Sequence, residues 1–258
     1  MKNIWSSFIV AFAMYSKIPM PGTEWTKDHM KYSMCFFPFV GVAVGLVEYG
    51  WFLLASYLGF GMVFRAAGMT LIPILVTGGI HMDGYLDTMD ALSSWREKEQ
   101  RLKILKDPHA GAFAIITGCV WFLTSFAAAT EITGYMLPFY CASFAVSRSF
   151  SGLSVICFHN ANPKGSAAAF SDQAQKKVTG CTLIIYLAVL LVVMCVLNPV
   201  LGITCFGAGL AVFFYYRWKS YNFFGGITGD LAGYFLCLAE LLMQLAVVFA
   251  AAVVNMVN

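Results

Sequence analysis

Residues 178–197 read VTGCTLIIYLAVLLVVMCVL, a run of twenty residues without a charged side chain. A transmembrane helix needs about 20 mostly apolar residues to cross the hydrocarbon core of a bilayer. Similar apolar runs recur along the chain, and we expect each of them to form a spanning helix. They cover residues 36–60, 64–80, 110–129, 133–158, 178–197, 199–216 and 231–254.

The composition of the whole chain supports a membrane protein. Of its 258 residues, 60% are hydrophobic and 11% are charged, whereas soluble domains average about 45–50% and about 25%. The net charge is only +3. These values exclude a soluble enzyme, a disordered chain and a basic nucleic-acid-binding module, so we expect a lipid bilayer and not nucleic acid as the surrounding partner.

The apolar runs also predict how the domain is organised. Residues 4–15 are apolar but too short to span, so we expect an interfacial helix there. The chain contains no internal repeat and no long linker. Residues 1–258 are therefore predicted to form one all-α domain, a polytopic membrane bundle of about seven transmembrane helices plus the N-terminal interfacial helix. The sequence leaves open whether this domain forms a homo-oligomer.

The basic residues predict the orientation of the bundle. All Lys and Arg residues except Arg65 and Arg148 lie in the loops on one side of seven spans. These loops are residues 1–35, 81–109, 159–177 and 217–230. Because positively charged loops remain in the cytoplasm, we expect this face to be cytoplasmic and the C-terminus to lie outside.

One of the cytoplasmic loops carries an unusual run of acids. Residues 78–90 read GGIHMDGYLDTMD. In a helix, at about 100° per residue, Asp83, Asp87 and Asp90 lie at about 0°, 40° and −20°, on one narrow stripe. Three adjacent carboxylates repel each other unless a cation neutralises them, and Mg²⁺ binds one or two carboxylates together with substrate phosphate oxygens. We therefore predict a metal site here, with a solvated acidic helix face as the alternative.

Other polar residues on this face are candidates for substrate contacts. Lys106 could pair with a phosphate, and Asp107 is either a further metal ligand or the N-cap of the next span. His81 is a candidate proton acceptor, with a simple hydrogen bond to a carboxylate as the alternative. Lys164 adds a cation in the glycine-containing loop at 160–166.

The last span begins with the glycine-rich sequence GGITGD at 225–230. Thr228 and Asp230, with the backbone N–H groups of this turn, could hold a phosphate or support a metal ion. A simple N-cap at Asp230 is the alternative for this acid.

Charged residues inside the spans indicate a functional or pairing role, because burying a charge in a membrane costs free energy. Arg148 is expected to reach an anionic substrate or to pair with an acid within the spans such as Glu48. For Glu240 and Gln244 on the last span, packing between helices is the favoured interpretation. Taken alone, the residues predict a Mg²⁺-dependent site at the cytoplasmic surface that transfers a phosphate-containing group.

The whole chain resembles the cobalamin (5′-phosphate) synthase family, also called adenosylcobinamide-GDP ribazoletransferase. The matching segments occur in the family's order, and the combination of the aspartate motif with GGITGD is specific. They are SKIPMP at 16–21, FPFVG at 37–41, residues 78–90, ILKD at 104–107 with Gly111, Arg148, GGITGD at 225–230 and Glu240. The chain departs from the family at Pro108 and His109 and at 160–164, where we expect Lys164 to supply a charge usually carried by an arginine.

The resemblance implies an activity and a location. Such enzymes join adenosylcobinamide-GDP to α-ribazole 5′-phosphate, release GMP, need Mg²⁺ and lie in the bacterial inner membrane. The resemblance places Asp83, Asp87 and Asp90 on the metal and diphosphate. It assigns supporting roles to Lys106, Asp107, Arg148 and Asp230.

Two other functions are alternatives. A CDP-alcohol phosphotransferase also uses aspartates on membrane helices, but Thr88 and Met89 stand where its motif would place Ala-Arg. A secondary transporter would need charged or broken-helix sites at mid-membrane and usually an inverted repeat, which the sequence lacks. Acids at one surface of the bundle favour an enzyme, and acids at mid-membrane favour a transporter.

Overall fold

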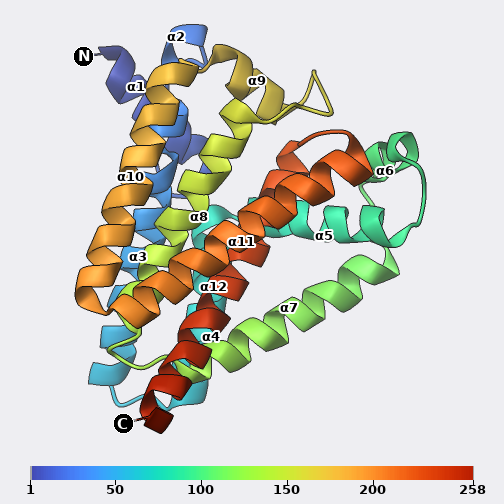
Figure 1. Ribbon diagram of the computed structural model, residues 1–258. Coiled ribbons are helices and arrows are strands. Elements are labelled where there is room, and N and C mark those ends of the chain that lie inside the picture. The colour runs from blue at the N-terminus through green and yellow to red at the C-terminus, as the bar shows by residue number, and fades with distance from the viewer. Residues whose placement is uncertain (1, 258) are drawn as a thin grey trace.

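The computed structural model describes residues 2–257, so residues 1 and 258 of the predicted domain lie outside the described part of the chain. The described residues form twelve helices and no strand (Figure 1). In chain order they are α1 (Lys2–Tyr15), α2 (Lys27–Met30), α3 (Ser33–Tyr57), α4 (Met62–Thr77), α5 (Ile80–Ser93), α6 (Lys98–Ile104), α7 (Ala112–Glu131), α8 (Leu137–Cys157), α9 (Ser166–Gln173), α10 (Lys176–Leu197), α11 (Pro199–Phe224) and α12 (Gly229–Val257).

Helices occupy all seven predicted spans, namely α3, α4, α7, α8, α10, α11 and α12. Five of them are long and apolar enough to cross a membrane alone, and α4 qualifies only with α5, from which a bend of 95° separates it. The polar α8 is not in this group, since it carries five serines and Arg148. The all-α polytopic bundle is confirmed, and within residues 2–257 five or six helices qualify as spans instead of about seven.

The central helix of the bundle is α8, and most of its side chains are buried. It packs against α3, α10, α11 and α12. The contact with α3 is close because a Cβ at Gly41 or Gly45 would overlap the carbonyl oxygen of Phe144 or Cys141. Small residues four positions apart allow membrane helices to approach in this way. The neighbouring helices therefore shield the polar α8 from lipid.

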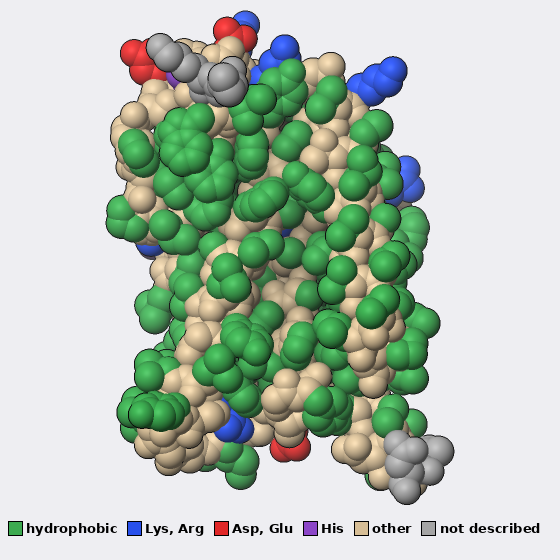
Figure 2. Space-filling model, turned by 90° about the vertical axis from the view of Figure 1, so that its left-hand side faces the viewer, with side chains coloured by type: hydrophobic (Ala, Val, Ile, Leu, Met, Phe, Trp, Pro, Cys, Tyr) green, Lys and Arg blue, Asp and Glu red, His purple; other side chains and the backbone are tan. Residues whose placement is uncertain are grey.

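The outside of the bundle is largely apolar. Hydrophobic side chains cover the middle of the face in Figure 2, and charged side chains lie mainly towards its ends. Exposed apolar residues such as Leu46, Leu123 and Val196 lie on the outer sides of α3, α7 and α10. The short helices α2, α6 and α9 lie at the end opposite to the α3–α4 and α10–α11 turns (Figure 1). This arrangement agrees with the predicted grouping of polar loops on one face.

The helix predicted at the N-terminus is present as α1. It packs on α3, and residues 9–12 are buried. Its placement at a membrane interface stays a prediction.

Two consecutive glycines make the sharp bend between α4 and α5. Gly78 has φ 67° and Gly79 has φ 78°, in the left-handed region that favours glycine. A Cβ at Gly78 would also overlap the side chain of Lys17. The bend turns α5 across the bundle (Figure 1), where it packs between α12 and α7. The aspartate motif is thereby carried against the start of the last helix.

Candidate active site

The three aspartates of α5 share one side of the helix, because α5 is continuous from Ile80 to Ser93. Asp83 is exposed, and Asp87 and Asp90 are half-buried. Asp87 lies close enough to Asp83, Asp90 and Asp230 for their charges to act on its carboxylate. We call these four residues the acid cluster. Its members come from two helices that are far apart in the sequence.

Asp230 is available to this cluster because another residue caps α12. Thr228 Oγ1 accepts a hydrogen bond of 3.2 Å from the Leu231 N–H, so Thr228 is the N-cap. The hydroxyl of Thr228 also lies 3.4 Å from Asp230 Oδ2, to which it donates. The alternative that Asp230 caps this helix is therefore wrong. Its carboxylate remains directed to the site.

Two glycines form the contact between α5 and α12. A Cβ at Gly84 would lie 2.7 Å from the carbonyl oxygen of Asp230. A Cβ at Gly233 would lie 2.9 Å from the carbonyl oxygen of His81. Side chains at these positions would separate the backbones, so the glycines allow Asp83 and Asp230 to border the same space. Sequence analysis missed Gly233, although it lies one turn after Asp230.

Gly84→Ala is expected to lower the free energy of unfolding by about 1–3 kcal/mol, because the added methyl group overpacks this contact. Thermal unfolding of the detergent-solubilised protein measures the change. Gly50→Ala is the matched control, since a Cβ at Gly50 of α3 meets nothing within 4 Å. Equal melting temperatures for the two variants would contradict the close helix crossing.

A cavity of about 130 Å³ adjoins the acid cluster and is bordered by Asp83 and Asp230. We call it the inner cavity. Tyr15, Phe37 and His81 form part of its wall, and the ring centroids of Tyr15 and Phe37 lie 4.3 Å apart. His81 Nε2 is buried and has no hydrogen-bond partner among the described residues. The alternative role of His81, a simple hydrogen bond to a carboxylate, is not seen.

A second cavity of about 150 Å³ also borders Asp230, and we call it the outer cavity. Lys106, Asn162 and Thr228 contribute its polar lining. The structure thus brings Lys106, Thr228 and Asp230, three of the residues predicted to contact substrate, together around one cavity. Lys164 is exposed in the neighbouring loop and lines neither cavity.

Asp90 links α5 to the start of α7. Its carboxylate accepts hydrogen bonds from the backbone N–H of Gly111 and, at 2.8 Å, from that of Ala114. The first N–H groups of a helix have no partner within it. Asp90 therefore satisfies the N-terminus of α7, and both of its oxygens are already hydrogen-bonded. Helical spacing within α5 could not indicate this role.

Asp107 does not cap α7, which begins at Ala112 with Gly111 as its N-cap, so the predicted capping role is wrong. Its Oδ1 instead accepts a 3.0 Å hydrogen bond from the His109 N–H and lies 2.8 Å from His109 Nδ1. This backbone hydrogen bond, followed by the contact with the ring, lowers the pKa of the exposed carboxyl. Asp107 is not among the acids that act on Asp87.

The predicted metal ligands do not form a closed metal site. Across residues 2–257 no group of three or more His, Cys, Asp or Glu side chains is arranged to hold a metal ion. The reason is that two of these acids already accept hydrogen bonds: Asp90 from the start of α7, and Asp107 from His109. Asp83 and Asp87 are the two predicted ligands for which the structure gives no such competing hydrogen bond.

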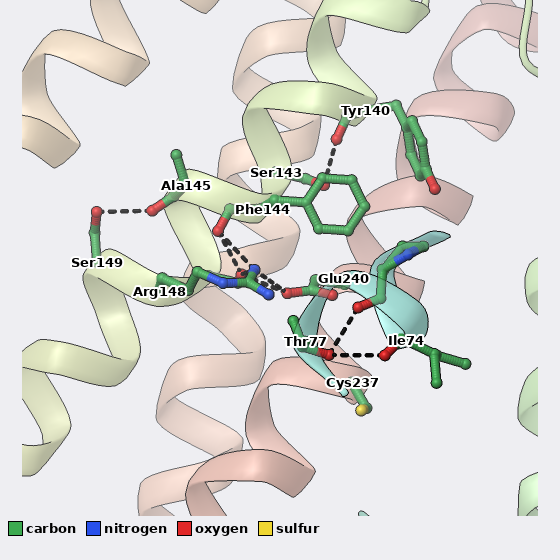
Figure 3. Close-up of polar contacts among 12 residues, drawn as sticks. Ile74, Thr77, Tyr140, Ser143, Phe144, Ala145, Arg148, Ser149, Cys237 and Glu240 are labelled. Atoms are coloured by element: carbon green, nitrogen blue, oxygen red, sulfur yellow. Dashed lines mark hydrogen bonds and ion pairs between the residues drawn. The ribbon is translucent and has the colours of Figure 1, made fainter. Parts of the chain in front are cut away.

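Arg148 is fully buried in α8 and pairs with Glu240 of α12 (Figure 3). Their Nη1 and Oε1 atoms lie 2.6 Å apart, and Ser147 Oγ donates to the same carboxylate oxygen at 2.8 Å. The suggested pairing with Glu48 is wrong, because Glu48 instead accepts a 3.3 Å hydrogen bond from the Tyr140 hydroxyl. Arg148 lines neither cavity, and its contact with a substrate stays a prediction.

Gln244, another polar residue of the last span, joins α12 to α7. Ser125 Oγ of α7 donates to Gln244 Oε1 at 3.3 Å, and Gln244 Nε2 donates to the Ser125 carbonyl oxygen at 3.3 Å. The predicted packing role of Gln244 between helices is confirmed.

The fold and the site define a class: a multi-pass membrane protein with acids, a cation and two small cavities beside the start of α12. This arrangement is suited to an enzyme that transfers phosphate-bearing groups. Comparison with protein families makes the assignment specific. Residues 7–248 match the family described as Cobalamin-5-phosphate synthase. The chain belongs to this family, and it is a transferase of cobalamin biosynthesis.

Curated relatives agree over nearly the whole chain. A protein of Lachnoclostridium phytofermentans named adenosylcobinamide-GDP ribazoletransferase is 45% identical over 96% of this chain and 95% of its own length. Proteins with the same name from Clostridium botulinum strain Eklund 17B and from Geobacillus sp. are 31% and 29% identical, over 93% and 92% of this chain and 96% and 92% of their own lengths. No solved structure matches the chain.

Proposed function

We propose that this chain joins adenosylcobinamide-GDP and α-ribazole 5′-phosphate to give adenosylcobalamin 5′-phosphate and GMP. A ribose hydroxyl oxygen bonds to the phosphorus attached to cobinamide. The bond from this phosphorus to the bridging oxygen breaks, GMP leaves with that oxygen, and the hydroxyl proton is released. The observation that carries the proposal is that Asp230 of the acid cluster borders two cavities, one with a cation and one with an unpaired histidine nitrogen.

The donor set of the acid cluster fits Mg²⁺ bound together with substrate. Mg²⁺ usually takes one or two protein carboxylates and completes its shell with water and substrate phosphates. Asp83 and Asp87 would hold the ion, because the carboxylate of Asp90 is already bonded to α7. When bound, the ion would neutralise negative charge on the diphosphate and on the leaving GMP. A site that lacks a third protein ligand agrees with this use.

The remaining residues divide between the two cavities. We assign the phosphate-bearing nucleotide to the outer cavity, because Lys106 and Asn162 supply a cation and a polar side chain there. His81 lines the inner cavity, and its unpaired Nε2 would accept the hydroxyl proton. Asp230 lies between the two and is placed to orient the reacting groups.

We further propose that the active face is cytoplasmic and that the protein lies in the bacterial inner membrane. The support is the apolar outer surface, together with the basic loops that carry all Lys and Arg residues except Arg65 and Arg148. The cytoplasm is also the side on which nucleotide substrates are available.

Release of GMP tests the proposed reaction. The purified protein in detergent or in lipid vesicles is incubated with adenosylcobinamide-GDP, α-ribazole 5′-phosphate and Mg²⁺. GMP is expected to appear only when both substrates are present, and EDTA is expected to stop its formation. A folded protein that releases no GMP under these conditions would contradict the proposed reaction. Release that is insensitive to EDTA would contradict the metal dependence alone.

A further inference from the structure

One serine of α8 differs from the other four in its hydrogen bonding. This helix carries Ser143, Ser147, Ser149, Ser151 and Ser154. Ser143, Ser149 and Ser154 donate their hydroxyls to carbonyl oxygens three or four residues earlier, at 2.6–2.8 Å, and Ser147 donates to Glu240. The Ser151 hydroxyl makes no hydrogen bond, although this residue is only 1% exposed. Burial of a hydroxyl without a hydrogen-bond partner destabilises the folded protein. The unpaired hydroxyl of Ser151 therefore indicates that a ligand supplies the missing hydrogen bond.

Ser151 is one of the residues that line the inner cavity. The other buried polar atom without a partner in this lining is His81 Nε2, and His81 is 8% exposed. Ser151 belongs to α8 and His81 to α5, and both residues line the same small cavity. Two residues of the lining therefore carry unused hydrogen-bonding groups, while Tyr15 and Phe37 provide an apolar wall.

The charge and size of the inner cavity restrict its ligand. The residues described in its lining include the two acids Asp83 and Asp230 and no Lys or Arg. Two carboxylates without a Lys or Arg disfavour a phosphate group that is not bound through a metal ion. A volume of about 130 Å³ is too small for a corrin ring. A neutral, compact group with several hydroxyls, such as a sugar ring, meets both conditions.

We propose that the inner cavity binds the sugar of the acceptor substrate and that Ser151 Oγ and His81 Nε2 hydrogen-bond to its hydroxyl groups. This inference rests on the proposed function, which supplies a riboside as acceptor. It adds Ser151 as a binding residue and separates the acceptor site from the nucleotide site at Lys106. Asp230 stands between the two and borders both.

The test compares Ser151→Ala with Ser149→Ala in the full-length protein. Ser149 is the matched control because it is equally buried in α8 but already donates to the Ala145 carbonyl oxygen at 2.8 Å. The dissociation constant of α-ribazole 5′-phosphate is measured by titration calorimetry in detergent, without turnover. Ser151→Ala is expected to weaken binding about fivefold, the effect of one neutral hydrogen bond. Ser149→Ala is expected to leave it within twofold.

A second measurement separates this inference from the proposed function. In the GMP assay, Ser151→Ala is expected to raise the KM for the acceptor about fivefold and to leave the KM for adenosylcobinamide-GDP unchanged. Equal effects on both substrates, or unchanged acceptor binding, would overturn the sugar site even if GMP is released. Selective loss of acceptor binding without any GMP release would support the sugar site and contradict the proposed reaction. Failure of the wild-type protein to bind the acceptor would overturn both.

Discussion

Replacing Asp83 or Asp87 by asparagine is expected to lower GMP release by at least about 1000-fold. Each substitution removes a negative charge but keeps the shape of the side chain, so the acid cluster loses half of the carboxylates that are free to hold a cation. Loss of a group that stabilises charge in the transition state typically costs about 100- to 1000-fold in rate. Here each substitution would weaken binding of both the metal ion and the diphosphate. We therefore expect a loss of rate at or above the upper end of this range.

Activity of the two variants is compared in the same detergent after their melting temperatures have been measured. Removing one charge from a cluster of acids relieves repulsion, so neither variant is expected to unfold more easily than the wild type. Glu97→Gln is the matched control, because Glu97 is an exposed acid near the same end of the bundle and caps α6 without a side-chain hydrogen bond. Full activity in both aspartate variants would remove the acid cluster from the reaction.

The spans and the aspartate stripe could be predicted because both depend on local patterns. A run such as residues 178–197 is apolar whatever its neighbours are, and α10 forms over almost the same residues, Lys176–Leu197. The stripe of Asp83, Asp87 and Asp90 follows from the helical repeat alone. Helix α8 shows that polar composition does not predict exposure, because its serines and Arg148 are polar yet lie at the centre of the bundle.

Relations between distant segments could not be predicted, since periodicity gives the face of a helix but not the helix that it meets. Glu48 and Glu240 were both acids within predicted spans, and only the crossing of α8 with α12 makes Glu240 the partner of Arg148. The capping role of Asp90 at the start of α7 has the same origin. Ser151 gave no signal in the sequence, because its lack of a partner depends on the cavity beside it.

Arg148→Met is expected to lower the free energy of unfolding by about 3–5 kcal/mol, the usual cost of leaving one member of a buried ion pair alone. The carboxylate of Glu240 would keep its hydrogen bond from Ser147 and lose its only cation within 4 Å among the described residues. Stabilities of folded proteins are about 5–15 kcal/mol, so this single change removes a large part of the total. Unfolding followed by tryptophan fluorescence in detergent measures the loss.

The double variant Arg148→Met/Glu240→Leu shows whether the unpaired charge causes this loss. Apolar residues of similar size commonly replace a buried ion pair without loss of stability, and both positions lie among buried side chains of α8 and α12. We therefore expect the double variant to regain most of the wild-type melting temperature, although the single variant does not. If the double variant is as unstable as Arg148→Met, then the packing of the arginine side chain, and not its charge, stabilises the centre of the bundle.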